Sequence, residues 1–197
     1  MTGSAANSPV RKRADAARNE QALLDAAAAV FIESGVQAPV RDIAARAGVG
    51  MGTIYRHFPT RADLIVAVYR HQVEACANAG SALLASAESP YAAVQQWIGR
   101  FVDFLVTKHG LAAVMRSDDA GFAALHSYFL DRLVPVCDKL LRAAANRHQI
   151  RLDVGAFELM YAVGNLCAGG EGDARYDARH VVGLLLDGLH SRNVVRR

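Results

Sequence analysis

Apolar residues recur at helical spacing along most of the chain, and this pattern restricts the fold more than any other feature. Val94, Trp97, Ile98 and Phe101 are one example, since positions i, i+3, i+4 and i+7 lie on one face of an α-helix. No run of β-branched residues alternates with polar ones, and glycine and proline are sparse inside the periodic segments. The sequence therefore predicts an all-α fold.

The first part of the chain predicts three helices, at residues 18–34, 40–47 and 51–57. Gly35 suits the left-handed position that ends the first helix, and Gly48 permits a tight turn between the second and the third. The third helix has only two clear apolar anchors, Ile54 and Phe58, so it is marginal in isolation and depends on its neighbours. Two short helices joined by a glycine turn predict a helix-turn-helix arrangement.

Longer helices are expected in the rest of the chain. Residues 60–63, Thr-Arg-Ala-Asp, have the form of a capping box, so a fourth helix should begin at Arg61 and run to about Ser86. The next helix starts at Pro90 and is expected to be interrupted at Gly110. Three more are expected, at residues 122–145, 154–167 and 178–190. The expected domain limits are a flexible basic arm (1–17), a helix-turn-helix domain (18–62) and a larger helical domain (63–197).

The positive charge is concentrated in the first part of the chain. Residues 1–61 hold eight Lys and Arg against five Asp and Glu, whereas the remainder holds fourteen of each sign. The whole net charge of +3 therefore belongs to the segment that contains the helix-turn-helix. A solvated basic face and a surface that attracts a polyanion both agree with the charge alone.

The sequence lacks the motifs that are typical of several classes of protein. The seven histidines form no His-x-x-x-His or Glu-x-x-His pair, and no serine lies in a Gly-x-Ser-x-Gly motif, so we expect neither an enzyme nor a cofactor or metal site. Cys76, Cys137 and Cys167 are far apart and odd in number, which favours buried, reduced thiols of a cytoplasmic protein. No stretch approaches the roughly 18 apolar residues of a membrane span.

The predicted third helix keeps a polar face free of its partners. The major groove of B-DNA, about 12 Å wide, admits one such helix. Short or rigid donors suit phosphate oxygens, and the N-terminal end of a recognition helix meets base edges. The candidate DNA contacts on this helix are Met51, Gly52, Thr53, Tyr55, Arg56 and His57. A bare three-helix scaffold, or a helical adaptor that binds protein, is the alternative interpretation.

The stretch IAARAGVGMGTIYRHFPTRADLI resembles the signature of the TetR family of bacterial transcriptional regulators, and the resemblance covers about residues 18–65. It implies an N-terminal helix-turn-helix domain, a long fourth helix and a C-terminal helical domain that binds a ligand and dimerises. The implied function is a homodimeric, sequence-specific DNA-binding regulator. In this family it is most often a repressor, here one released from DNA by a small, mainly apolar ligand.

The resemblance also assigns individual residues. Thr53, Tyr55 and His57 take the DNA-contact positions of the family. Arg61 stands where the family usually has a phosphate-binding lysine, and Arg41 is a further expected contact. Two positions differ: Gly50 replaces the usual serine cap, and Pro39 replaces a Thr or Ser cap. Both changes remove a hydroxyl that could bind phosphate, which bears on affinity.

Aromatic and sulfur-containing side chains gather in the C-terminal part of the sequence. Such a stripe is either plain core or the wall of a cavity, and the family resemblance implies a small-molecule cavity in this domain. A pocket of this kind needs a few polar groups among apolar walls. The candidate pocket residues are Trp97, Phe101, Phe104, Met115, Phe122, His126, Phe129, Met160 and Asn165.

The last two predicted helices carry more apolar surface than one thin layer would bury, which is typical of an interface. In the resembled family these helices pair with their copies in a four-helix dimer interface. A two-fold symmetric dimer would present two recognition helices to a near-palindromic operator. The candidate interface residues are Val154, Phe157, Tyr161, Val181, Leu184, Leu185 and Leu189.

Overall fold

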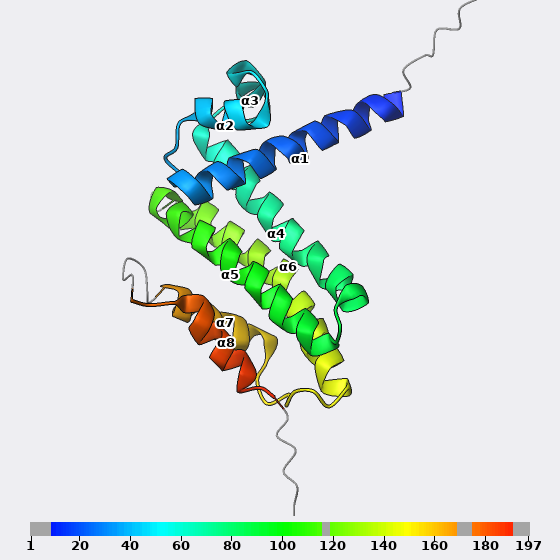
Figure 1. Ribbon diagram of the computed structural model, residues 1–197. Helices are drawn as coiled ribbons and strands as arrows, with labels where there is room; N and C mark the ends of the chain where they lie inside the picture. Colours follow the sequence, from blue (N-terminus) through cyan, green and yellow to red (C-terminus); the bar gives the residue numbers. More distant parts are fainter. Residues whose placement is uncertain (1–8, 116–118, 169–174, 191–197) are drawn as a thin grey trace, which may run out of the picture. The chain divides into compact units, whose positions relative to one another are not determined.

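The computed structural model describes residues 9–115, 119–168 and 175–190, and side chains within 16–105, 124–168 and 175–190. These residues form eight α-helices, and the β-structure among them is one isolated bridge between Ile150 and His190 (Figure 1). The helices are α1 (Pro9–Ser34), α2 (Val40–Ala47), α3 (Met51–His57), α4 (Arg61–Ser86), α5 (Pro90–Met115), α6 (Asp119–Asn146), α7 (Ala156–Ala168) and α8 (Ala178–Asp187). The predicted all-α fold is confirmed.

The chain divides into two compact units, Met1–His71 and Gln72–Arg197. The division falls inside α4, so this helix contributes to both units. The boundary expected from the sequence, after residue 62, lies in the first turn of the same helix.

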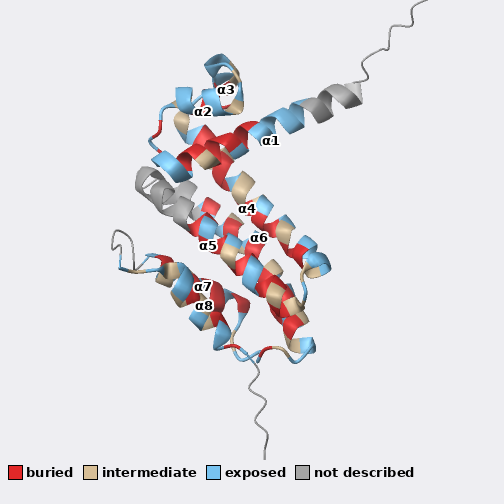
Figure 2. Ribbon diagram, viewed as in Figure 1, coloured by how far each residue is buried: buried red, intermediate tan, exposed pale blue. Residues whose placement is uncertain are grey.

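Helix α1 is longer than the sequence predicted. It begins at Pro9, so the expected flexible arm of residues 1–17 is helical from Pro9 onward, and residues 1–8 lie outside the described part. Proline is favoured at the first helical position, and the Ala-, Arg- and Glu-rich segment after it has high helix propensity. Residues 16–22 of this helix are exposed, whereas burial begins at Leu23 (Figure 2).

The N-terminal unit packs α1, α2, α3 and the first part of α4 around one small core. Ala27 and Ile43 are fully buried at 0% exposure, and Ile54 is buried at 1%. Because Ala44 is small and also buried, α2 can approach its neighbours closely. Val49 is half-buried, and the predicted anchors Ile54 and Phe58 are buried. The other buried residues of this core include Leu24, Ala27, Phe31, Ile43 and Ala44.

The turn between α2 and α3 has the predicted geometry. Gly48 takes a left-handed conformation with φ 66°, and its N–H bonds to carbonyl groups in the last turn of α2. The next N–H, of Val49, bonds to the Ala44 carbonyl oxygen at 3.0 Å, which ends the helix as a Schellman-like cap. Pro39 precedes α2 as its N-cap and is not part of its first turn.

A reciprocal capping box begins α4, as predicted. The Thr60 backbone N–H donates to Asp63 Oδ2 at 2.9 Å, and the Asp63 N–H donates to Thr60 Oγ1 at 3.1 Å. Pro59 disfavours helical geometry at Phe58, so α3 ends at His57. Three residues, Phe58 to Thr60, then connect α3 to α4.

The C-terminal unit is built on α5 and α6, which pack along each other, with the later part of α4 and with α7 and α8 (Figure 1). Trp97 is completely buried, and its indole N–H donates to the Cys76 carbonyl oxygen of α4 at 2.9 Å. The expected interruption at Gly110 is wrong, because α5 continues through it to Met115. A single glycine costs a helix only about 1 kcal/mol.

The three cysteines are buried and form no disulfide, in agreement with the sequence prediction of buried thiols. Burial raises the pKa of the Cys76 and Cys137 thiols to about 12, so both stay protonated at neutral pH. Within the described residues, no helix combines the length and the apolar character that crossing a membrane requires.

Candidate nucleic-acid interface and ligand cavity

Helix α3 buries one edge and exposes the rest. Ile54 is 1% exposed and Phe58, just after the helix, is 7% exposed, so these two residues anchor α3 to its unit. Met51 and Tyr55 are about half exposed, at 51% and 49%. The predicted DNA-contact residues on α3 therefore lie on its outer surface, with Thr53 half-buried: Met51, Gly52, Thr53, Tyr55, Arg56 and His57.

Arg56 lies along the exposed side of α3. Its Nε donates to the Gly52 carbonyl oxygen at 3.3 Å, and its Nη2 donates to Thr53 Oγ1 at 3.2 Å. Both bonds are long and solvent-exposed, so they hold the guanidinium only weakly. Arg56 is therefore available to an anion that approaches this face.

Arg41, in the first turn of α2, is also exposed. Its side chain is 78% accessible, and its Nε lies 3.4 Å from the carboxylate of the neighbouring Asp42. An exposed pair of this kind contributes little to stability and does not sequester the arginine. Arg46, by contrast, bridges α2 to α1 through a 2.6 Å bond to Glu33.

Arg61, which the family resemblance assigned to a phosphate contact, does not extend freely into solvent. It is half-buried, and its Nη2 donates to the carbonyl oxygens of Val36 and Ala38, the latter at 2.7 Å. Both carbonyl groups belong to the connection between α1 and α2. The guanidinium is therefore engaged inside the N-terminal unit.

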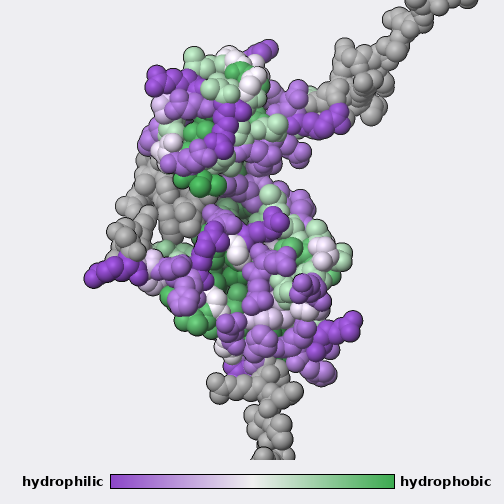
Figure 3. Space-filling view, in the orientation of Figure 1, coloured by the Kyte–Doolittle hydropathy of each residue, from purple (hydrophilic) through white to green (hydrophobic). Residues whose placement is uncertain are grey.

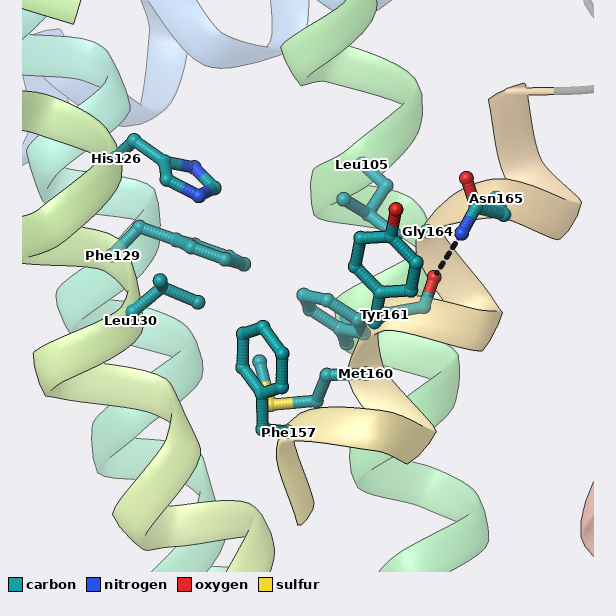
Figure 4. A pocket seen from close by; sticks show the side chains of 10 residues that line it. Leu105, His126, Phe129, Leu130, Phe157, Met160, Tyr161, Gly164 and Asn165 are labelled. Carbon is teal, nitrogen blue, oxygen red and sulfur yellow. Dashed lines mark hydrogen bonds between the residues drawn. The ribbon is translucent and has the colours of Figure 1, made fainter. Parts of the chain in front are cut away.

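The C-terminal unit contains a cavity of about 270 Å³ walled by α5, α6 and α7. His126 and Phe129 of α6 lie on one side, and Phe157 and Tyr161 of α7 lie on the other (Figure 4). The lining residues are Phe101, Leu105, His126, Phe129, Leu130, Phe157, Met160, Tyr161, Gly164 and Asn165. Among the residues whose side chains the structure describes, no Asp, Glu, Lys or Arg lines this cavity, so its polar groups are few.

Two polar side chains are fixed within the cavity wall. The His126 ring stacks on the Phe129 ring, with centroids 5.9 Å apart and planes at 24°. Asn165 Nδ2 donates to the Tyr161 carbonyl oxygen at 3.0 Å, one helical turn earlier (Figure 4). Apolar walls with a few placed polar groups are typical of a small-molecule site.

The structure brings together five of the nine predicted pocket residues: Phe101, His126, Phe129, Met160 and Asn165. Trp97 and Phe104 do not line the cavity, because both are packed in the adjacent core. The predictions for Met115 and Phe122 fall on side chains outside the described residues.

The cavity also contains residues that the sequence did not assign to it. Phe157 and Tyr161 are candidate interface residues in the sequence, and both also line the cavity. Leu105, Leu130 and Gly164 were not predicted at all. For Leu105 the sequence did contain a signal: it lies one helical turn after Phe101 and therefore on the same face of α5.

Three large apolar side chains are exposed on α7 and α8. Phe157, Tyr161 and Leu184 are 51%, 65% and 58% exposed. Figure 3 shows hydrophobic patches among hydrophilic residues in the region of α8. Val154, Val181 and Leu185 are half-buried. Leu189 is 7% exposed and so belongs to the interior of the chain.

A charged cluster joins α4 to α6 within the C-terminal unit. Glu74 of α4 accepts bonds from Arg132 and from the Tyr128 hydroxyl, both on α6. The Arg132 bond, followed by the Tyr128 bond, lowers the pKa of the Glu74 carboxyl below its usual value. The carboxylate is therefore ionised at neutral pH, and the cluster is fully formed.

Comparison with known proteins identifies both parts of the chain. Residues 23–68 match the family model described as bacterial regulatory proteins, tetR family. Residues 89–191 match the model described as transcriptional regulator SbtR-like, C-terminal domain. The first match contains the helix-turn-helix, and the second contains the cavity-lining helices.

Solved structures resemble this chain over most of its length. The TetR transcriptional regulator SCO0520 from Streptomyces coelicolor is 33% identical with a TM-score of 0.78, and the match covers 88% of this chain and 99% of that one. The TetR regulatory protein from Mycobacterium vanbaalenii is 31% identical with a TM-score of 0.69, covering 90% and 98%.

A curated relative matches over the N-terminal part. The HTH-type transcriptional repressor LfrR of Mycolicibacterium smegmatis is 46% identical over 54 residues, which are 27% of this chain and 28% of that protein. The relatives and the families are transcriptional regulators, which confirms the expectation that the chain is not an enzyme. The chain belongs to the TetR family of bacterial transcriptional regulators.

Proposed function

We propose that this regulator is a homodimeric, sequence-specific repressor that a small, mainly apolar ligand releases from a near-palindromic operator. The DNA-binding part of this proposal rests on how α3 is packed. Two buried anchors, Ile54 and Phe58, hold the helix in place while its remaining side chains stay exposed or half-exposed. A helix presented in this way fits the major groove.

The proposed DNA contacts divide by role. Thr53, Tyr55 and His57 would bind phosphates, and Arg56 would reach a phosphate or a guanine. Arg41 would add a phosphate contact from α2, because it is highly exposed. Met51 and Gly52, at the N-terminal end of α3, would meet base edges. Arg61 is not among these contacts, because its guanidinium is bonded to the connection between α1 and α2.

The proposed dimer uses the apolar surface of α7 and α8. Exposed Phe157, Tyr161 and Leu184 would lose their contact with water when two copies pair through these helices. Val154, Val181 and Leu185 would border the contact, whereas Leu189 would support it from inside the chain. Two-fold symmetry would then place two copies of α3 on two half-sites.

The proposed ligand would bind in the cavity between α5, α6 and α7. Six of the lining side chains are apolar, which favours a mainly apolar compound, and His126 and Asn165 would orient it. Phe129 and Leu130 belong to α6, and the same helix is joined to α4 through Glu74. A ligand that shifts α6 would therefore shift α4, which begins in the DNA-binding unit.

The DNA part can be tested without knowing the operator. Wild-type protein is used to select duplexes from a random library, and affinity for a selected duplex is then measured at several salt concentrations. Each lost phosphate contact should reduce the log–log salt slope by about 0.9, so Arg41→Ala should show this reduction. Arg142→Ala is the matched control, because Arg142 is also an exposed, ion-paired arginine but lies on α6. Affinity that does not respond to salt would refute the proposal.

A further inference from the structure

Arg61 is distinguished from the other arginines by its surroundings. Among the arginines whose side chains are described, it alone is not exposed. Its Nη2 donates to two carbonyl oxygens, those of Val36 and Ala38. Its Nε is buried and bonds to no described residue. A surface cation that waits for a phosphate would not be buried in this way.

The two carbonyl groups lie where the chain turns from α1 into α2. Gly35, with φ 77°, reverses the chain after α1, and Val36 and Ala38 are buried at 7% and 3% exposure. Buried backbone carbonyl groups need a hydrogen-bond donor. Arg61 supplies that donor to both, so it holds the connection between α1 and α2 in one conformation.

The Arg61 bonds also constrain α3, because they join the two ends of the α2–α3 segment. Helix α2 begins at Val40, directly after the bonded carbonyl groups, and α3 ends at His57, shortly before Arg61. One side chain therefore ties the start of α2 to the start of α4. Both ends of the α2–α3 segment are fixed by the same contact.

We propose that Arg61 is a positioning residue, which holds the α2–α3 segment in the orientation needed for reading DNA and does not use its charge on a phosphate. The inference rests on the proposed DNA-binding function and assigns Arg61 a role different from the phosphate contact that the family resemblance implied. Arginine suits this role, because its planar guanidinium offers several donors in fixed directions, whereas lysine offers a flexible point charge.

The difference between arginine and lysine provides the test. Arg61→Lys keeps the charge and most of the stem, whereas Arg61→Met removes the charge. Arg56→Met is the matched control, because Arg56 is an exposed arginine on α3. Affinities of the full-length proteins are measured for a duplex selected by the wild type and for a random duplex of equal length, across several salt concentrations. Circular dichroism at the same temperature establishes that each variant is folded.

The expected result is that both Arg61 variants reduce the ratio of selected to random affinity roughly tenfold, about the effect of losing one hydrogen bond to a charged group. Their salt slope should equal that of the wild type, whereas Arg56→Met should reduce the slope by about 0.9. If Arg61→Met does not fold, Arg61→Lys carries the same comparison.

Two results would overturn the inference while leaving the proposed function intact. In the first, Arg61→Met lowers the salt slope and Arg61→Lys restores it, which is the behaviour of a phosphate contact. In the second, both folded variants keep the wild-type affinity ratio, which would make the residue important for stability alone. A wild-type protein that selects no duplex would instead refute the proposed function, and the inference with it.

Discussion

Glu74 and Arg132 form a two-point ion pair between α4 and α6. Arg132 Nε donates to Glu74 Oε1 at 2.6 Å, and Arg132 Nη2 donates to Oε2 at 2.6 Å. The hydroxyl of Tyr128 donates to the same Oε1 at 2.5 Å. Bidentate, charge-assisted bonds fix both distance and orientation. The pair therefore joins α4 to the helix that carries His126 and Phe129 of the cavity wall.

We expect Glu74→Gln to weaken the communication between ligand and DNA. The variant should bind DNA and ligand separately as the wild type does, but the ligand should lower DNA affinity less. Typical coupling energies of about 1–3 kcal/mol correspond to a change in DNA affinity of about 5–150-fold. In the variant we expect the ligand to change DNA affinity by a factor near the lower end of this range. The measurement is a DNA titration with and without a compound found by thermal shift. If the ligand lowers DNA affinity equally in the variant and the wild type, the Glu74–Arg132 pair does not couple the two sites.

The same pair should make stability sensitive to acid. The Glu74 pKa is lowered in the folded protein from its usual value of about 4.5, so its stabilising effect is present above that pH and is lost as the pH falls through the lowered pKa. The urea midpoint of the wild type should exceed that of Glu74→Gln at pH 7, and the gap should close below about pH 4.5. A gap that is independent of pH would contradict this account.

Gly80 and Gly99 should respond oppositely to alanine. A Cβ on Gly80 of α4 would overlap Cγ1 of Val136 on α6, whereas a Cβ on Gly99 of α5 would meet nothing within 4 Å. Because valine is stiff and the core is tightly packed, Gly80→Ala should destabilise the protein by about 1–3 kcal/mol. Gly99→Ala should stabilise it by about 0.5–1 kcal/mol. Denaturant unfolding of both variants tests the pair, and a neutral Gly80→Ala would show that α4 and α6 can separate at low cost.

The two glycines around Val49 should also differ. Gly48 has φ 66°, which an alanine adopts only with strain, whereas Gly50 has an ordinary φ of −75°. Gly48→Ala should therefore cost about 1 kcal/mol of unfolding free energy. Gly50→Ser should add a few tenths of a kcal/mol by capping α3, and its hydroxyl should strengthen DNA binding. Calorimetry and a DNA titration measure the two effects, and a destabilising Gly50→Ser would rule out the cap.

Leu184→Arg should prevent dimerisation with little effect on the folded monomer. Leu184 is already 58% exposed, so the substitution removes few contacts within the chain, but it would place a charge in the proposed interface. Leu152→Arg is the control, because Leu152 is 49% exposed and lies outside α7 and α8. Sedimentation at micromolar concentration should show a dimer for the wild type and the control, and monomers for Leu184→Arg. A monomeric wild type would refute the proposed dimer.

The bounds of the short helices followed from the sequence because local rules set them. Gly48 ends α2 in a left-handed conformation, Pro59 stops α3, and Thr60 with Asp63 caps α4, so each boundary depends on residues within a few positions. The exposed face of α3 followed as well, since two anchors define which side is buried. The stretch that resembles the family signature, residues 43–65, lies within this locally determined segment.

The tertiary structure decided what depends on neighbours distant in sequence. Local signals placed a break at Gly110, but α5 continues through it, since one glycine costs less than a packed helix gains. Helical spacing could not separate core from cavity: Trp97 and Phe101 lie one turn apart, yet Trp97 is bonded to Cys76 of α4 and only Phe101 faces the cavity. Arg61 was assigned to DNA by its place in the motif, whereas two carbonyl groups more than twenty residues earlier hold its guanidinium. Periodicity specifies which face of a helix is buried, but only the packing of other helices specifies what that face meets.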